Sequence, residues 1–198
     1  ARLDISLELF AQLAAAPELK GWDGLGLAVQ AYGRRAKPAL QYLADVATQT
    51  GRVLPVRLVK GAYWDTEIKR AQEGGLETYP VFTRKASTDV SYLACAKFML
   101  ARRDTFFPQF ATHNAHSVAA IAVMSGEDKR YEFQRLHGMG EALYEGVVGQ
   151  GDINQPCRIY APVGSHEDLL AYLVRRLLEN GANTSFVNRL ADDTAPID

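Results

Sequence analysis

The chain has 198 residues, of which 47% are hydrophobic and 23% are charged, a composition typical of one globular domain with a sizeable core. This composition excludes a disordered chain, a collagen and a coiled coil. The 22 Lys and Arg residues against 23 Asp and Glu residues give a formal net charge of −1, so no general attraction to nucleic acid is expected. Any anion site must therefore be local.

Five segments have the character of short β-strands, and each ends at a glycine, a proline or a polar cluster. They cover residues 24–33, 54–63, 108–114, 131–138 and 157–164. Apolar residues at helical spacing occupy stretches between and after these segments, at residues 38–50, 88–101, 116–124 and 167–180. The alternation predicts an α/β fold in which parallel strands are joined by helical crossovers.

Polar residues recur at or near the carboxyl end of each predicted strand. They are Gln30, Lys60 to Trp64, Thr112 to Asn114, Gln134, His137 and Tyr160. In a TIM-type (β/α)8 barrel this face carries the active site, whereas a doubly wound sheet concentrates its contacts at one switch point. The pattern favours the barrel. A complete barrel needs about 250 residues, and only five units can be counted, so an open five-stranded sheet remains the alternative.

The segment "RLVKGAYWD" places one cation on each face of a predicted strand. If alternation continues along residues 57–64, Arg57 and Lys60 point in opposite directions. A buried strand tolerates cations only when they find acceptors, either in ion pairs or in an electron-rich ligand lying over the strand end. Gly61 would admit such a ligand and Trp64 would provide an aromatic wall. A third interpretation is a lyase that uses Lys60 as a Schiff-base nucleophile.

The segment "FATHNAH" offers a weak metal signal and a stronger capping signal. His113 and His116 lack an acidic or cysteine partner at ligand spacing, so we expect no metal site. Thr112 and Asn114 either donate to phosphate oxygens or cap the following helix. Cys95 and Cys157 lie in apolar settings and are predicted to be reduced thiols in the core.

The stretch "YLVRRLLENGANTSFVNR" begins within the last predicted helix. At 100° per residue, four leucines share one face that should seat the helix on the core: Leu169, Leu170, Leu173 and Leu177. The adjoining sector is polar and holds Tyr172, Arg175, Arg176 and Glu179. This sector is either a solvated side with an Arg175–Glu179 pair, or a clamp in which two guanidinium groups bind a carboxylate or phosphate.

Five motifs together resemble one family. "RLVKGAYWD", "PQFATHNAHS", "YEFQRLHGMGE", "CRIYAPVG" and "YLVRRLLENGANTSFVNR" are similar, in order, to the proline dehydrogenase domain of the bacterial proline utilization A flavoenzymes. The resemblance runs from about Leu3 to the C-terminus. It implies a (β/α)8 barrel that binds FAD non-covalently and oxidises L-proline to Δ1-pyrroline-5-carboxylate by hydride transfer to flavin N5, the first step of proline catabolism to glutamate.

The resemblance also implies the residues that contact the cofactor. Arg57 would lie near flavin N5, where its charge stabilises the anionic reduced flavin, and Gln30 would hydrogen-bond the isoalloxazine system. The other implied cofactor contacts are Val59, Lys60, Gly61, Ala62, Tyr63, Trp64, Arg84, Lys85, Thr112, His113, Asn114, Gln134, Leu136, Glu179, Ser185 and Phe186.

Substrate contacts are implied for the last strand and the helix after it. Arg175 and Arg176 would clamp the proline carboxylate, Glu179 would orient their guanidinium groups, and Tyr160 would pack on the pyrrolidine ring. With Arg57, the two arginines and Tyr160 form the expected catalytic set. The alternatives are a non-catalytic barrel fragment that binds FAD or a carboxylate, and the lyase that uses Lys60.

The family's first three βα units, which supply a carboxylate-binding lysine and an aspartate, have no counterpart in this sequence. Residues 1–198 are therefore expected to form about the last five units of the barrel, with no second domain in the chain. The partners implied are L-proline, proline-like carboxylate inhibitors, a membrane quinone as electron acceptor and a linked aldehyde dehydrogenase domain. The implied location is the cytoplasm, with peripheral association at the inner face of the membrane.

Overall fold

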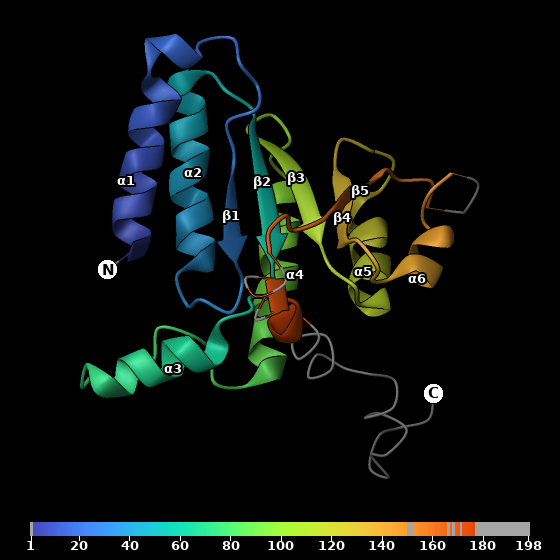
Figure 1. Cartoon of the computed structure of the whole chain (residues 1–198). Coiled ribbons are helices and arrows are strands. Elements are labelled where there is room, and N and C mark those ends of the chain that lie inside the picture. The colour runs from blue at the N-terminus through green and yellow to red at the C-terminus, as the bar shows by residue number, and fades with distance from the viewer. Residues whose placement is uncertain (1, 150–152, 166, 168, 171, 177–198) are drawn as a thin grey trace.

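The computed structural model describes residues 2–149, 153–165, 167, 169–170 and 172–176. Five parallel strands form one sheet in the order β1-β2-β3-β4-β5 (Figure 1). The strands are β1 (Leu27–Gln30), β2 (Leu54–Val59), β3 (Phe106–Ala111), β4 (Glu132–Leu136) and β5 (Cys157–Tyr160). Each predicted segment contains one of them, although β3 begins two residues early. Within the described residues the order never reverses, as expected for an arc of a barrel.

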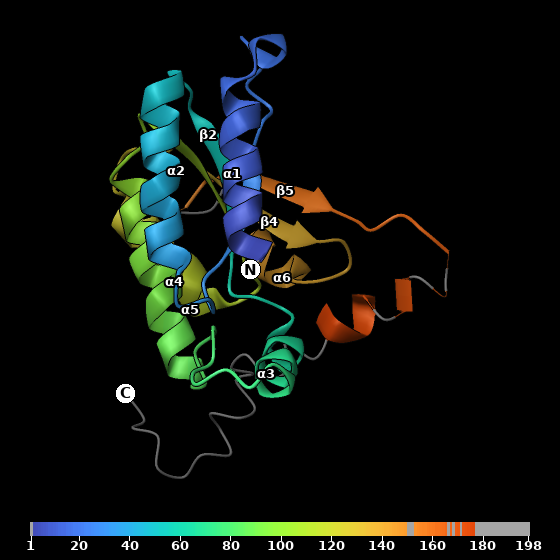
Figure 2. The same ribbon diagram turned by 90° about the vertical axis from the view of Figure 1, so that its left-hand side faces the viewer.

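Helices α2 (Ala36–Thr50), α4 (Lys85–Leu100) and α5 (Ala115–Ser125) cover one face of this sheet. The other named helices are α1 (Arg2–Ala15), η1 (Pro17–Leu19), α3 (Trp64–Glu73) and α6 (Glu141–Glu145). Helix α4 packs on β2 and β3 and lies between α2 and α5, while α1 packs outside α2 (Figures 1 and 2). The three predicted crossover helices are confirmed as α2, α4 and α5. Helices α1, α3 and α6 were not predicted.

The last predicted helix, 167–180, is only partly described. Residues 167, 169–170 and 172–176 are helical, and the remainder of the prediction lies outside the described residues. None of the described helices combines the length and the apolar character that crossing a bilayer would require.

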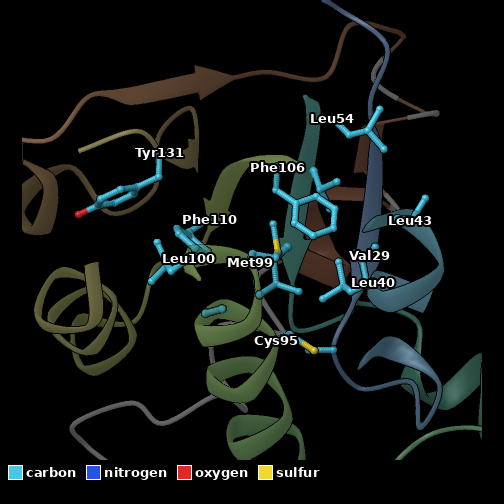
Figure 3. Packing of buried hydrophobic residues seen from close by; sticks show 14 of the residues in the cluster. Val29, Leu40, Leu43, Leu54, Cys95, Met99, Leu100, Phe106, Phe110 and Tyr131 are labelled. Carbon is cyan, nitrogen blue, oxygen red and sulfur yellow. The ribbon is translucent and has the colours of Figure 1, made fainter. Parts of the chain in front are cut away.

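The core lies between the sheet and these helices. Val56 and Leu58 of β2 alternate with more accessible neighbours, so the strand buries one side chain in two against the helical layer. Figure 3 shows Cys95 and Met99 of α4 packing beside Phe106 of β3. Each such large apolar side chain contributes roughly 1.5–3 kcal/mol when it is fully buried.

Both cysteines are free thiols, as predicted. Cys95 is fully buried in the core, where burial raises the pKa of its thiol. Cys157 is only partly buried and packs against the core, so the predicted core position is confirmed only in part for this residue. Burial still raises the pKa of the Cys157 thiol to about 11, which keeps it protonated at neutral pH.

The strand predicted through Trp64 ends earlier, because the backbone turns at Gly61. Strand β2 stops at Val59, Gly61 adopts a φ of +126°, and α3 begins at Trp64. A Cβ atom on Gly61 would lie 2.6 Å from the ring of Tyr32. Alternation therefore holds to Lys60 and fails beyond it, since this backbone conformation and this close approach both require glycine.

Replacing Gly61 with alanine is expected to lower the free energy of unfolding by roughly 3 kcal/mol, because the variant combines backbone strain with a clash against a buried ring. Urea denaturation of the purified protein measures the effect. The matched control is Gly75→Ala, where φ is +60° but a Cβ atom would meet no neighbour within 4 Å. The control should cost about 1 kcal/mol. Equal losses in the two variants would contradict the steric role of Tyr32.

Candidate functional site

The carboxyl ends of the strands meet at one edge of the sheet, which we call the carboxyl edge and which holds Gln30, Val59, Leu136 and Tyr160. Gln30 pairs in register with Val59, and Leu136 pairs with Tyr160. The arrowheads of β1 and β2 point toward α3 and the helical residues 172–176 (Figure 1). Most of the predicted site residues that the structure describes lie at or near this edge.

The sheet face opposite the helices is polar, and we call it the inner face. Its polar members include Gln30, Arg57, Gln109, Glu132, Gln134, Arg158 and Tyr160. Arg57 Nε donates a hydrogen bond of 2.5 Å to Gln134 Oε1, and its guanidinium carbon lies 4.8 Å from the centroid of the Tyr160 ring. The fold thus joins three predicted residues from β2, β4 and β5.

Glu132 is an inner-face residue that the sequence analysis missed. Its Oε1 accepts hydrogen bonds from Gln134 (2.7 Å), Gln109 (2.9 Å) and Arg158 (2.9 Å), and its Oε2 accepts one from Arg158 (3.0 Å). Burial alone would raise the pKa of the Glu132 carboxyl, but these donors outweigh it and the pKa is lowered. The spacing of Glu132 and Gln134 in "YEFQRL" could have indicated it, because residues two apart on a strand lie on the same face.

Lys60 points the other way, into the helical layer. Its ammonium lies 2.5 Å from Asp89 Oδ1 on α4, and Asp89 Oδ2 accepts a second bond of 2.7 Å from Lys85. The ion-pair interpretation is confirmed for this cation. Because the carboxylate of Asp89 engages the Lys60 side-chain nitrogen, that nitrogen is not free to attack a carbonyl, which argues against the Schiff-base lyase. Asp89 was also missed, although its i,i+4 spacing from Lys85 is visible in the sequence.

The end of β2 and the last helical residues lie together. The ring centroid of Tyr63 is 5.4 Å from the guanidinium carbon of Arg175 and 5.9 Å from that of Arg176. Arg176 also lies 5.0 Å from the ring of Tyr172. Residues separated by more than a hundred positions therefore form one cationic and aromatic group. Trp64, beside Tyr63, donates from Nε1 to the carbonyl oxygen of Phe82 over 2.8 Å.

The leucines of this helix do not seat it on the core as predicted. Leu170 is 53% exposed and Leu173 is 39% exposed. The ring contacts that join this helix to Tyr63 come from Arg175 and Arg176, whereas Leu170 and Leu173 face outward and Leu169 is partly buried. Helical periodicity identified the stripe, but periodicity carries no information about which side meets the sheet. Leu177, Glu179, Ser185 and Phe186 lie outside the described residues.

The segment Thr112 to Asn114 is held by bonds within the fold. Asn114 Oδ1 accepts from the backbone N–H of Ser117 over 2.9 Å, which confirms the predicted helix cap. His113 Nε2 accepts from the N–H of Leu136 over 3.1 Å. Tyr144 donates to the carbonyl oxygen of Thr112 over 2.9 Å. Among the described residues no group of three or more His, Cys, Asp or Glu side chains could hold a metal ion.

Two predicted residues lie at the periphery of the site. Gln30 is exposed at the end of β1, and Arg84 is exposed immediately before α4. Gln30 lies at the carboxyl edge beside Val59, and Arg84 lies at the start of α4.

The ion pairs of Asp89 should make the free energy of unfolding depend on pH. Burial raises the pKa of its carboxyl, but the bonds from Lys60 and Lys85 outweigh burial, so the pKa is lowered. The stabilising charge is therefore fully present above the ordinary carboxyl pKa of about 3.9 and is lost as pH falls through the lowered value. Because Asp89 is partly exposed, we expect Asp89→Asn to cost about 2 kcal/mol at neutral pH.

Urea denaturation at several pH values tests this expectation. The difference in the free energy of unfolding between wild type and Asp89→Asn should become smaller in acid. The control is Glu73→Gln, which breaks the exposed pair of Lys69 and Glu73 on α3, separated by 3.7 Å. It should cost less than about 0.5 kcal/mol. A difference in unfolding free energy that stays constant down to strongly acidic pH would contradict the stabilising role of the Asp89 charge.

Comparison with known proteins agrees with this geometry. The profile of the family described as Proline dehydrogenase matches residues 1–189. The chain is 64% identical over 203 residues to the bifunctional protein PutA of Klebsiella aerogenes and 63% identical to that of Escherichia coli K12. These alignments cover all of this chain but only 16% and 15% of the relatives.

Solved structures show the same fold. A Bradyrhizobium japonicum PutA mutant superposes with a TM-score of 0.87 at 60% identity, covering 98% of this chain and 20% of that one. PutA from Bdellovibrio bacteriovorus inactivated by N-propargylglycine superposes with a TM-score of 0.86 at 38% identity, over the same shares of the two chains. The prediction of an α/β fold of the TIM-barrel type is confirmed. The chain belongs to the proline dehydrogenase family.

Proposed function

We propose that this chain forms part of a flavin-dependent proline dehydrogenase that oxidises L-proline to Δ1-pyrroline-5-carboxylate, the first step of proline catabolism to glutamate. The observation that carries the proposal is the pair Arg175 and Arg176, whose guanidinium groups lie over Tyr63 just beyond the end of β2. Such a pair can bind a substrate carboxylate through charge-assisted hydrogen bonds, and the family match supports proline as the substrate.

The groups at the carboxyl edge fit FAD in their chemistry. FAD combines a flat ring system, which becomes anionic on reduction, with a negatively charged pyrophosphate. Arg57 offers a cation on the inner face and Arg84 offers one at the start of α4, where the neighbouring Lys85 is paired with Asp89. Trp64 offers an aromatic surface that is 40% exposed. When bound, FAD would supply the acceptor for a hydride from the proline ring carbon next to nitrogen.

Several residues would hold the cofactor in this proposal. Arg57 and Gln30 would contact the ring system, while Thr112 and Asn114 would contact the phosphate and adenosine part. The ammonium of Lys60 already forms an ion pair with Asp89, so in this proposal Lys60 would contact the cofactor through its backbone or its aliphatic chain. The remaining candidates are Val59, Gly61, Ala62, Tyr63, Trp64, Arg84, Lys85, His113, Gln134, Leu136, Glu179, Ser185 and Phe186.

The substrate would be oriented by charge at one end and by an aromatic ring at the other. Arg175 and Arg176 present planar donor groups that match a carboxylate, and Glu179 would orient them. Tyr160, held against Arg57 on the inner face, would pack on the pyrrolidine ring. Anchoring the carboxylate determines which ring carbon meets the hydride acceptor, a proximity effect that lowers the barrier by several kcal/mol, on the order of 7–11 in the most favourable cases.

The full protein would act with further partners. The matched relatives are named bifunctional and the chain spans 16% of one of them, which supports a linked second enzyme, an aldehyde dehydrogenase in this proposal. Reoxidation by a membrane quinone would require peripheral contact from the cytoplasmic side. The relative inactivated by N-propargylglycine supports proline-like amino acids as inhibitors of this site.

A visible spectrum of the full-length protein tests the cofactor and the substrate together. We expect the absorption bands of oxidised flavin in the purified protein and their bleaching when L-proline is added without air. D-proline is the control, since the carboxylate clamp would present its ring in the wrong orientation. A protein without flavin bands would contradict FAD binding, and bands unchanged by L-proline would favour a binding protein without catalysis.

Arg176→Met is expected to weaken proline use far more than flavin binding. Removing one fork of the clamp should lower kcat/KM for proline by roughly 100-fold, or about 2.7 kcal/mol, while flavin content changes little. The matched control is Arg130→Met, an exposed arginine just before β4 and thus at the opposite end of that strand from the carboxyl edge. Equal losses of proline and flavin binding in Arg176→Met would contradict its role in binding the carboxylate.

A further inference from the structure

Arg57 is held by the side-chain amide of Gln134, and the carboxylate of Glu132 determines the orientation of that amide. The side-chain amide of Gln134 has one acceptor end and one donor end. Its Nε2 donates 2.7 Å to Glu132 Oε1, and its Oε1 accepts 2.5 Å from Arg57 Nε. An ionised carboxylate can only accept, so Glu132 draws the donor end of the amide toward itself and leaves the carbonyl oxygen for Arg57.

The carboxylate of Glu132 is neutralised elsewhere. Arg158 of β5 binds it through two hydrogen bonds, one to each oxygen, at 2.9 and 3.0 Å. Gln109 of β3 adds a third donor at 2.9 Å. Glu132 is buried while the Arg158 side chain is 61% exposed, so the pair places its positive partner toward solvent.

Arg57 itself meets only neutral groups in the part of the chain that the structure describes. Besides the Gln134 amide, its guanidinium lies 4.8 Å from the centroid of the Tyr160 ring. A ring face attracts a cation without carrying a net charge. No described carboxylate forms an ion pair with Arg57.

We propose that Gln134 is a positioning residue that insulates Arg57 from Glu132, so that the guanidinium is fixed in place while its positive charge stays uncompensated. Arg158 completes the arrangement by neutralising Glu132. The inference rests on the proposed function, because the charge of Arg57 matters most beside a flavin that becomes anionic on reduction. A carboxylate in direct contact with Arg57 would offset that charge and make reduction less favourable.

The decisive variant relocates the carboxylate without changing the composition of the inner face. In the double variant Glu132→Gln/Gln134→Glu, the acid contacts Arg57 and the amide contacts Arg158, with the net charge preserved. We expect the flavin midpoint potential of the full-length, flavin-loaded protein to shift to a more negative value. Spectroelectrochemistry with a chemical reductant measures it and does not depend on proline turnover.

The matched control is Glu132→Gln alone, which leaves a neutral amide on Arg57 and should give a potential equal to or higher than that of wild type. A double variant with the wild-type potential would overturn the insulation. If the double variant fails to retain flavin, Arg158→Gln decides the question. It removes an exposed cation and leaves Glu132 unneutralised, so a more negative potential is expected and an unchanged one overturns the proposal.

These outcomes are separate from those of the proposed function. Wild-type protein whose flavin is not bleached by L-proline would contradict proline oxidation, yet its potential and those of the variants could still be measured. A wild-type protein that is bleached by proline, with a double variant of unchanged potential, would contradict the insulation alone.

Discussion

Side chains on a parallel strand alternate between two faces, and the remaining features of the site depend on how β2 resolves this constraint. One face must be apolar because α4 covers it, while the other borders the inside of the barrel arc. Arg57 of β2 nevertheless points onto the inner face, and Lys60, the residue after β2, points into the helical layer. Each cation requires an acceptor within reach, since an unpaired charge at such a site is costly.

The two cations are satisfied by different chemistry. Lys60 forms an ion pair with the carboxylate of Asp89, which Lys85 also binds. The charge of Lys60 therefore links the end of β2 to α4 and is not available to a ligand. Arg57 meets the neutral oxygen of Gln134 and the ring of Tyr160, so its charge is positioned and remains available. Arg57 within β2 and Lys60 directly after it therefore supply a cation suited to a ligand and a structural cation, three residues apart.

Much of the architecture could be predicted because it follows from local periodicity. Alternation and helical spacing located all five strands and the helices α2, α4 and α5. Helix α3 was missed because the apparent alternation of "RLVKGAYWD" continues through Gly61, where the backbone turns and meets the ring of Tyr32. The outward-facing leucines of the last helix were misread because periodicity defines a stripe and not its partner.

The sequence by itself determined the order of the elements, the family motifs and the placement of polar residues at strand ends, because these depend on neighbours along the chain. Only the tertiary structure decided which groups pair. Asp89 with Lys60, Glu132 with Arg158 and Gln134 with Arg57 each join residues from different elements. Strand register and helix packing select these partners, and no local pattern encodes the distance between side chains so far apart in the chain.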